Sequence, residues 1–189
     1  MTVSSELDAR FRDVAAAEGL LDVAYDFVDT PVGQLLVAVT ERGVCEISYD
    51  PDEECEAESL ARHFGTRVLR SPRPTDHARR QLDEYFAGKR RTFDVPVDLS
   101  ATREFAHAVL DELARVPYGE LTTYGALAAK AGRPRAARAV GTVMNRNPVP
   151  IVLPCHRVIG STGALVGYGG GLERKRTLLE LEGALSPST

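Results

Sequence analysis

A cysteine and a histidine stand side by side at Cys155 and His156, and Arg157 follows them. A free cysteine has a pKa of about 8.5, so only a few per cent of it is the nucleophilic thiolate at neutral pH. An imidazole can accept the thiol proton, and a nearby guanidinium adds positive charge. Pro154 restricts the backbone just before the sulfur. These residue types predict a nucleophilic cysteine at position 155.

Adjacency in sequence does not by itself bring the sulfur and the imidazole together. Successive side chains on a strand point to opposite faces, so contact between Cys155 and His156 requires a turn or a bridging water. A buried structural cysteine beside a packing histidine is the alternative interpretation. The pair alone does not decide between the two.

The charge of the chain is divided unevenly. The net charge is -4, but residues 1–120 hold 14 Lys and Arg against 24 Asp and Glu, whereas residues 121–189 hold 9 against 3. Residues 121–172 include no acidic residue and carry six basic ones: Lys130, Arg133, Arg135, Arg138, Arg146 and Arg157. Affinity for nucleic acid depends on local basic surface more than on net charge. The C-terminal part is therefore predicted to face phosphate.

Two short helices are predicted in this basic segment. Thr123 is a suitable N-cap for the first, residues 132–134 form a turn, and residues 135–145 form the second. Small residues on the second helix let its backbone approach a groove closely, and Arg135 and Arg138 are predicted to lie on one side of it. The pattern predicts a helix-turn-helix. An ordinary helix pair with a solvated charged face is the alternative.

The first hundred residues have a different pattern. Apolar and polar residues alternate around turn signals over residues 23–50, which predicts antiparallel strands. Residues 56–64 and 75–86 have helical periodicity, and residues 92–99 alternate again. We expect a small antiparallel sheet with helices packed on it, and an α+β fold class for the whole chain.

The pattern becomes helical near residue 100, where a second domain is predicted to begin. The expected domains are residues 1–99 and residues 100–189. Residues 1–20 are expected to be either a flexible or a helical extension, and the residues after Gly183 are expected to be a flexible tail.

The three cysteines show no C-x-x-C spacing, which argues against a disulfide framework and a structural zinc site. Cys45 and Cys55 are predicted to be ordinary packing or surface residues. No metal and no cofactor are expected. The N-terminus carries charges and no long apolar run, so neither a signal peptide nor a membrane span is expected, and the protein is predicted to be cytoplasmic.

The segment around Cys155 resembles the O6-alkylguanine-DNA alkyltransferases, also called methylated-DNA--protein-cysteine methyltransferases. Their signature matches IVLPCHRVI at residues 151–159. Flanking motifs agree in order and spacing: VPYGE at 116–120, AARAVG at 136–141, NPVP at 147–150 and GYGGGL at 167–172. The resemblance is strong from residue 81 to residue 183 and loose over the N-terminal sheet. It implies a ribonuclease H-like N-terminal domain and a C-terminal domain of the winged helix-turn-helix type, which binds DNA and accepts the alkyl group.

The activity that this resemblance implies is DNA repair by direct damage reversal. The protein would flip the damaged guanine out of double-stranded DNA and move the alkyl group from O6 to its own cysteine, once and irreversibly. It would bind through the minor groove as a monomer in solution, with cooperative assembly on DNA and activity on O4-alkylthymine left open.

The resemblance also implies roles for individual residues. Cys155 matches the acceptor, His156 the base that deprotonates it through water, and Glu182 the carboxylate that orients the histidine. Asn147 matches the residue that braces the active-site turn. Tyr124 matches the tyrosine that crowds the 3' phosphate and protonates the guanine ring.

Further residues are implied by the same match to contact the nucleic acid. Arg138 matches the finger that fills the hole left in the base stack. The other DNA-binding residues implied are Thr123, Arg135, Ala136 and Ala137. The residues implied to form the substrate pocket are Pro150, Val158, Tyr168 and Gly169, with the Gly169 N–H near O6.

Two other functions fit some of these features. A Cys-His hydrolase or acyltransferase would use the same sulfur repeatedly, and its mark would be multiple turnover. A noncatalytic DNA-binding regulator would bind DNA equally well without Cys155. Alkyltransferase-like proteins that only sense lesions carry Trp at the acceptor position, and Cys155 argues against that class.

Overall fold

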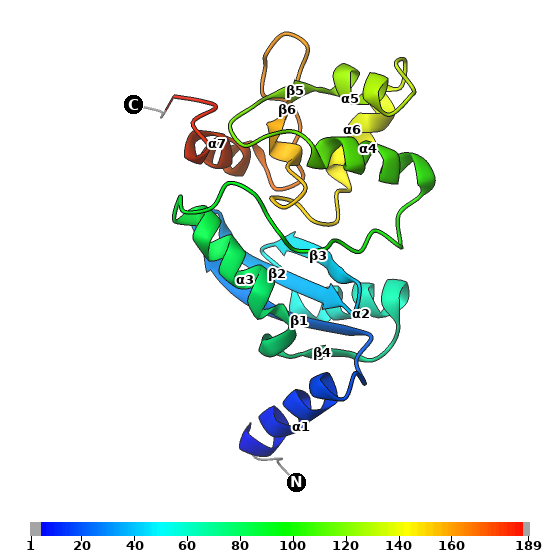
Figure 1. The fold of residues 1–189 in the computed structure, drawn as a ribbon, viewed down its shortest axis with the longest axis vertical. Helices are drawn as coiled ribbons and strands as arrows, with labels where there is room; N and C mark the ends of the chain where they lie inside the picture. Colours follow the sequence, from blue (N-terminus) through cyan, green and yellow to red (C-terminus); the bar gives the residue numbers. More distant parts are fainter. Residues whose placement is uncertain (1–4, 187–189) are drawn as a thin grey trace. The chain divides into compact units, whose positions relative to one another are not determined.

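A computed structural model describes residues 5–186 and divides into two compact units (Figure 1). The first unit comprises the described residues up to Arg90 together with Asp94–Ala101. The second comprises Arg91–Phe93 together with the described residues from Thr102 onward. Sheet and helices both contribute, so the predicted α+β class is confirmed.

The first unit is built on a four-stranded sheet in the order β3-β2-β1-β4. The strands are β1 (Val23–Thr30), β2 (Gly33–Thr40), β3 (Gly43–Tyr49) and β4 (Val68–Arg70). The first three pair antiparallel, as predicted, whereas β4 pairs parallel with β1. The sheet is therefore mixed and not purely antiparallel. β4 escaped prediction because three residues are too few to show an alternation.

Three helices belong to this unit, namely α1 (Ser5–Ala17), α2 (Glu53–Phe64) and α3 (Pro72–Phe86). α2 and α3 cover opposite faces of the sheet (Figure 1). Both begin three residues before the predicted starts at 56 and 75. The side chain of Asp52 caps α2 by accepting from the N–H of Cys55 at 2.9 Å, and Pro72 suits the first turn of α3. Such capping turns carry no apolar periodicity, so the sequence pattern placed both starts too late.

The residues 92–99 do not form the strand that their alternation predicts. Among the described residues, they join the sheet through an isolated bridge between Val44 and Val97. Pro96 has no N–H to donate, and the carboxylate of Asp98 accepts from the Thr40 hydroxyl at 2.7 Å. The segment passes so close to Gly43 that a Cβ there would lie 2.3 Å from the Pro96 carbonyl oxygen. The strand ladder therefore ends after one contact.

The core of the first unit lies between the sheet and its helices. One cluster of buried side chains consists of Val23, Tyr25, Leu36, Ala38, Cys45 and Leu60. Cys45 is buried there and Cys55 is exposed, and both are free thiols, as predicted.

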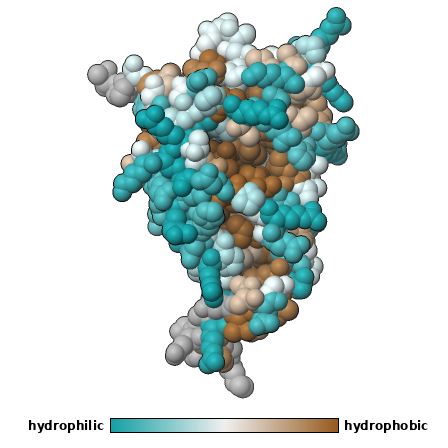
Figure 2. Space-filling model, viewed as in Figure 1, coloured by the Kyte–Doolittle hydropathy of each residue, from teal (hydrophilic) through white to brown (hydrophobic). Residues whose placement is uncertain are grey.

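The predicted extension at residues 1–20 is helical over Ser5–Ala17, and residues 1–4 lie outside the described part of the chain. This helix, α1, holds to the rest of the unit through the buried Ala15 and through a hydrogen bond from the Arg12 guanidinium to the Arg70 carbonyl oxygen at 3.1 Å. It leaves Leu7 and Phe11 more than half exposed. Figure 2 shows the resulting apolar surface at this end of the unit.

The second unit contains the two helices predicted for DNA binding, α5 (Tyr124–Lys130) and α6 (Ala137–Asn145). Its other elements are α4 (Glu104–Ala114), β5 (Thr122–Thr123), the 3-10 turn η1 (Cys155–Arg157), β6 (Val158–Ile159) and α7 (Leu172–Leu181). Thr123 caps α5 as predicted, because its hydroxyl accepts from the Ala126 N–H at 3.1 Å. The helix predicted over residues 135–145 begins only at Ala137.

That late start corrects the placement of Arg135. The N–H of Ala136 donates to the Arg133 carbonyl oxygen at 2.9 Å, which closes a turn before the helix begins. Arg135 and Ala136 therefore belong to the turn, and Arg135 does not share a helix face with Arg138.

Packing of α4, α5 and α6 fixes the start of α5 against the cysteine segment. These helices contribute buried side chains to the core of the unit, namely Val109, Leu110, Leu113, Leu127 and Val140. β5 pairs parallel with β6 and places Thr123 opposite Ile159. Tyr124 and the turn that carries Cys155 consequently adjoin the same small sheet. None of the helices in residues 5–186 combines the length and the apolar composition needed to cross a membrane.

Candidate active site

The chain reaches Cys155 through a strained turn. Ile151, a β-branched residue, has a φ of 74° and is fully buried. Such residues rarely adopt this left-handed conformation, and it persists only where the surroundings impose it. The Leu153 N–H donates to the Val149 carbonyl oxygen at 2.9 Å, and the Cys155 N–H donates to the Leu153 carbonyl oxygen at 2.8 Å. This bonding holds the sulfur-bearing residue in a fixed place.

Asn147 braces the turn from inside. Its side-chain amide donates to the Leu153 carbonyl oxygen at 2.8 Å, and its Oδ1 accepts from the Val149 N–H at 3.1 Å. Both bonds satisfy backbone groups that the irregular turn would otherwise leave unpaired. The brace ties Asn147 to the segment that leads directly to Cys155.

The side chain of Cys155 is 5% exposed. Burial raises the pKa of its thiol, while hydrogen bonding from Asn147, the charge of Lys175 and hydrogen bonding from Tyr168 act in the opposite direction. The sulfur thus lies in an enclosed site whose polar neighbours favour the thiolate. Such a site suits a nucleophile that is activated only when its proton is removed.

A buried charge network involves the two residues that follow Cys155. The Glu182 carboxylate accepts from His156 Nε2 at 2.9 Å, from Arg157 Nε and Nη2 at 2.8 Å each, and from the Gly119 N–H at 3.1 Å. Its pKa lies far below the ordinary value because hydrogen bonds from His156 and Arg157 outweigh the effect of burial. Glu182 is therefore ionised, and its carboxylate accepts a hydrogen bond from Nε2 of His156.

The other ring nitrogen of His156, Nδ1, differs from Nε2 in its surroundings. His156 Nδ1 is buried and has no hydrogen-bond partner among the described residues. Burial lowers the pKa of the imidazole, against the opposing effect of Glu182, so His156 is neutral at neutral pH. With Nε2–H donated to Glu182, Nδ1 is the nitrogen left to accept a proton.

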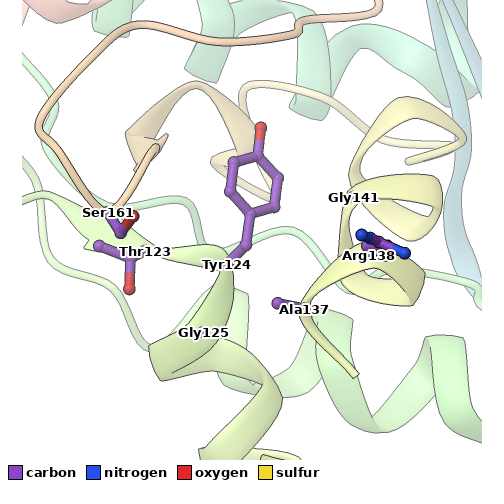
Figure 3. Close-up of a pocket in the computed structure, with 7 residues that line it drawn as sticks. All are labelled: Thr123, Tyr124, Gly125, Ala137, Arg138, Gly141 and Ser161. Atoms are coloured by element: carbon purple, nitrogen blue, oxygen red, sulfur yellow. The ribbon is translucent and has the colours of Figure 1, made fainter. Parts of the chain in front are cut away.

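Tyr124 lines a cavity of about 440 Å³ in the same unit. The residues that line it are Thr123, Tyr124, Gly125, Ala137, Arg138, Gly141 and Ser161 (Figure 3). The Tyr124 hydroxyl donates to the Val166 carbonyl oxygen at 3.2 Å. Burial and the nearby Cys155 raise its pKa, so the phenol stays protonated. Two features therefore line the same cavity: the phenol of Tyr124, which can donate a proton, and the helix that carries Arg138.

The structure brings most of the predicted site residues into two groups. The first contains Cys155, on whose thiol Asn147 and Tyr168 act, and the next residue, His156, which is bonded to Glu182. The second lines the cavity and contains Thr123, Tyr124, Ala137 and Arg138. Arg135 and Ala136 are not among the residues that line the cavity.

The remaining pocket residues keep their roles only as predictions. Pro150 and Val158 are buried, and Gly169 is exposed. A Cβ on Gly169 would lie 3.3 Å from the Asn145 carbonyl oxygen, so its backbone passes close to the end of α6.

Three residues of the site were not predicted from the sequence: Lys175, Gly119 and Ser161. Arg157, which was predicted to add charge near the thiol, pairs with Glu182, and the charge that acts on the thiol is that of Lys175. Gly119 contributes its N–H to Glu182, and its φ of 77° explains the glycine. Ser161 lines the cavity. A lysine in an apolar helix stripe and a glycine after Tyr118 were the available signals.

No three His, Cys, Asp or Glu side chains gather as metal ligands anywhere in the described residues. The acid–base groups that the site offers are a thiol, an imidazole, a carboxylate and a phenol. Together they can remove a thiol proton, hold the resulting positive charge on an imidazole, and return a proton to a departing group.

Comparison with known proteins covers nearly the whole described chain. The model of the 6-O-methylguanine DNA methyltransferase ribonuclease-like domain matches residues 23–99, and the model of the DNA binding domain of the same family matches residues 104–184. The methylated-DNA--protein-cysteine methyltransferase of Mycolicibacterium paratuberculosis is 41% identical over 172 residues, which are 88% of this chain and 96% of that protein. The constitutive methylated-DNA--protein-cysteine methyltransferase of Bacillus subtilis is 38% identical over 159 residues, which are 84% of this chain and 94% of that protein.

Solved structures agree. The crystal structure of Mycobacterium tuberculosis OGT in complex with DNA has a TM-score of 0.73 at 39% identity and covers 85% of this chain and 93% of that one. The O6-methylguanine-DNA methyltransferase from Pyrococcus kodakaraensis has a TM-score of 0.60 at 28% identity, over 85% of this chain and 99% of that one. The family that the motifs around Cys155 resemble is thereby confirmed, and the chain belongs to the 6-O-methylguanine DNA methyltransferase family.

Proposed function

We propose that this protein repairs DNA by moving the methyl group of O6-methylguanine to its own Cys155. The observation that carries the proposal is a buried thiol followed directly by a buried neutral histidine. Nε2 of this histidine is bonded to Glu182, and its Nδ1 has no hydrogen-bond partner among the residues that the structure describes. Relatives that share most of this chain's length carry the name of this activity. Residues 1–99 form the ribonuclease-like domain in this proposal, and residues 100–189 bind DNA and accept the alkyl group.

The chemistry follows from the protonation states. A bridging water passes the thiol proton of Cys155 to Nδ1 of His156, and Glu182 stabilises the imidazolium. The thiolate then attacks the methyl carbon, the bond between that carbon and O6 breaks, and its electron pair passes to guanine. Tyr124, which is protonated, donates to the guanine ring as negative charge develops there. Over the reaction the thiol loses one proton and guanine gains one.

The product is a thioether, and its hydrolysis would have to expel the Cys155 thiolate from a methyl carbon, for which a thiolate is a poor leaving group. No group of the proposed site is assigned to its hydrolysis, so each molecule reacts once. This single turnover distinguishes the proposal from a Cys-His hydrolase, which would regenerate its sulfur.

Recognition of the lesion uses the second group of residues. In the proposal, α6 lies in the minor groove with Ala137 and Gly141 allowing close approach, and Arg138 takes the place of the flipped nucleotide. A guanidinium suits this role because it is planar and keeps its charge near phosphate. A methylated guanine pairs weakly, so extruding it costs less than extruding a normal base. Double-stranded DNA is the partner in this proposal, and the free protein is a monomer in solution.

The test is stoichiometry. Purified protein is mixed with excess duplex that carries radiolabelled O6-methylguanine, and label on the polypeptide is followed with time, alongside Cys155→Ser. We expect a plateau near one methyl per protein, absent in the variant, and a methylated Cys155 peptide by mass spectrometry. Repeated turnover would favour the hydrolase, and DNA binding without transfer would favour a noncatalytic regulator.

A further inference from the structure

Lys175 is a lysine with no exposed surface in the middle of α7. Its ammonium donates to the Val158 carbonyl oxygen at 2.6 Å, to the Val166 carbonyl oxygen at 2.9 Å and to the Gly167 carbonyl oxygen at 3.5 Å. An ammonium has three N–H donors, and a neutral amine has two. The three acceptors therefore match the charged form of the side chain.

The charge of this lysine lacks an acidic partner. None of the carboxylates of the described residues forms an ion pair with Lys175, and the buried carboxylate of the site, Glu182, is taken by His156, Arg157 and Gly119. A buried cation without a counter-charge is costly, and carbonyl dipoles offset only part of that cost. The charged form of Lys175 therefore calls for a further group whose negative charge stabilises it.

Lys175 binds the carbonyl of Val158, three residues after Cys155, and the thiol of Cys155 is the ionisable group whose charge favours the ammonium. Burial lowers the pKa of Lys175, and the charge of Cys155 opposes this change. Reciprocally, the charge of Lys175 counteracts the rise in the pKa of the Cys155 thiol. Asn147 and Tyr168 face the same sulfur as hydrogen-bond donors, Tyr124 lies near it, and His156 is the neutral base. Of these groups, only Lys175 carries a full positive charge before the reaction begins.

We propose that Lys175 is a positioning residue whose buried ammonium balances the charge of the Cys155 thiolate and holds the Val166 carbonyl beside Tyr124. This inference rests on the proposed function, since it concerns the same sulfur. When the thiol proton moves to His156, a negative sulfur and a positive imidazole form, and Lys175 keeps all three of its own protons. The ammonium therefore takes part through charge and hydrogen bonds, without exchanging a proton.

The second half of the proposal concerns the loop between β6 and α7. The Val166 carbonyl oxygen accepts both from Lys175 Nζ and from the Tyr124 hydroxyl at 3.2 Å. The Val158 carbonyl, which Lys175 also binds, belongs to the strand that follows the cysteine turn. One ammonium thus links the strand after the nucleophile to the loop that contacts the phenol. In this proposal the link helps to set the distance between the sulfur of Cys155 and the hydroxyl of Tyr124.

Two substitutions separate charge from shape. Lys175→Met removes the charge and the donors at similar length, and Lys175→Gln removes the charge but retains an N–H donor. Lys89→Met is the control, because Lys89 is exposed in the first unit. The thiol pKa is read from the pH dependence of iodoacetamide alkylation at the Cys155 peptide, which mass spectrometry separates from the peptides of Cys45 and Cys55. Methyl transfer in a single turnover is measured across the same pH range.

Both Lys175 variants are expected to raise the thiol pKa by about one unit and to slow methyl transfer at neutral pH by about tenfold, with the rate recovering as the pH rises. Lys89→Met leaves both quantities unchanged. An unchanged thiol pKa in both variants overturns the assignment of charge balance. An equal loss of rate at every pH overturns it too, and supports only the link from Lys175 through the Val166 carbonyl to Tyr124. If the wild type itself transfers no methyl, the proposed function has failed, whereas the thiol pKa still tests Lys175.

A second measurement does not depend on the Lys175 variants folding. The chain has three lysines, Lys89, Lys130 and Lys175, so selective isotope labelling gives three side-chain signals in an NMR titration. In Cys155→Ser, which cannot form a thiolate, Lys175 is expected to lose its proton at a lower pH than in the wild type, and the other two lysines are expected to titrate unchanged. Identical Lys175 titrations in both proteins overturn the proposal.

Discussion

His156 Nε2 lies 2.9 Å from Glu182 Oε1, and neither side chain has any exposed surface. This contact fixes the ring and commits Nε2 to donating, so the imidazole can accept only through Nδ1. Arg157 and the Gly119 N–H bind the same carboxylate and neutralise part of its charge. Glu182 therefore orients the base without holding a proton on it at neutral pH.

Removal of the Glu182 charge is the first test of this relationship. In Glu182→Gln the amide nitrogen replaces one acceptor with a donor, which leaves Arg157 buried without a counter-charge. Breaking a buried ion pair in this way costs about 3–5 kcal/mol, and we expect that loss in the free energy of unfolding measured with denaturant. Methyl transfer by the remaining folded protein is expected to fall at least about tenfold, because the orientation of His156 is lost.

The control is Glu173→Gln, an exposed glutamate in the first turn of α7, the helix that Glu182 caps at its other end. It is expected to keep both the stability and the rate of the wild type. Equal unfolding free energies for the two variants would contradict the role assigned to Glu182.

Stability should depend on pH through two buried groups. Burial lowers the pKa of His156 from 6.5, so the unfolded chain binds a proton at a pH where the folded chain does not, and stability falls as the pH drops below 6.5. The pKa of Glu182 is lowered from 4.5, chiefly by its bonds to His156 and Arg157 against the effect of burial. The stability it contributes is present above 4.5 and is lost as the pH falls below it. Denaturant titrations at a series of pH values measure both effects.

His156→Gln isolates the first effect. Its unfolding free energy is expected to depend less on pH than that of the wild type between 6.5 and 4.5. Parallel curves for the two proteins in this window would mean that His156 is not a buried neutral base.

Asn147 is expected to matter for both the turn and the reaction. Asn147→Ala leaves the Leu153 carbonyl and the Val149 N–H without their side-chain partner, at a cost of about 1–3 kcal/mol in unfolding free energy. The strained Ile151 conformation loses its support, so Cys155 moves and transfer slows by more than the loss of folded protein explains. Asn145→Ala, an exposed asparagine two residues earlier, is the matched control, and a normal rate in Asn147→Ala contradicts the bracing role.

The sequence predicted the chemistry better than it predicted the contacts. Cys155, His156 and Glu182 were assigned because motifs keep their spacing, and the carboxylate does meet the imidazole. Lys175 was not assigned, because a lysine on a helix is ordinarily solvated and only the packing of α7 against β6 reveals that it is buried. The sequence predicts that Arg157 acts on the thiol. Its guanidinium instead donates two hydrogen bonds to the Glu182 carboxylate, because the planar guanidinium fits a carboxylate in this bidentate geometry.

The fold shows a similar division. The hairpins of β1, β2 and β3 follow from alternation that is visible over many residues. β4 and the early helix starts depend on pairing and capping, which a periodicity does not record. The start of α6 was misplaced because the residues after Pro134 have good helix propensity, yet they close a turn instead.

The last prediction concerns Arg138, which lines the cavity beside Tyr124 and is exposed (Figure 3). If it replaces a flipped nucleotide, Arg138→Ala slows transfer from duplex DNA by at least about tenfold, since flipping costs a few kcal/mol. Transfer from free O6-methylguanine base stays unchanged, because no base stack has to be opened. Arg138→Lys restores salt-dependent affinity but not the rate, because an ammonium cannot fill the gap. Arg115→Ala, which removes an exposed arginine paired with Glu112, controls for charge, and equal losses on duplex and free base would place Arg138 in the chemical step instead.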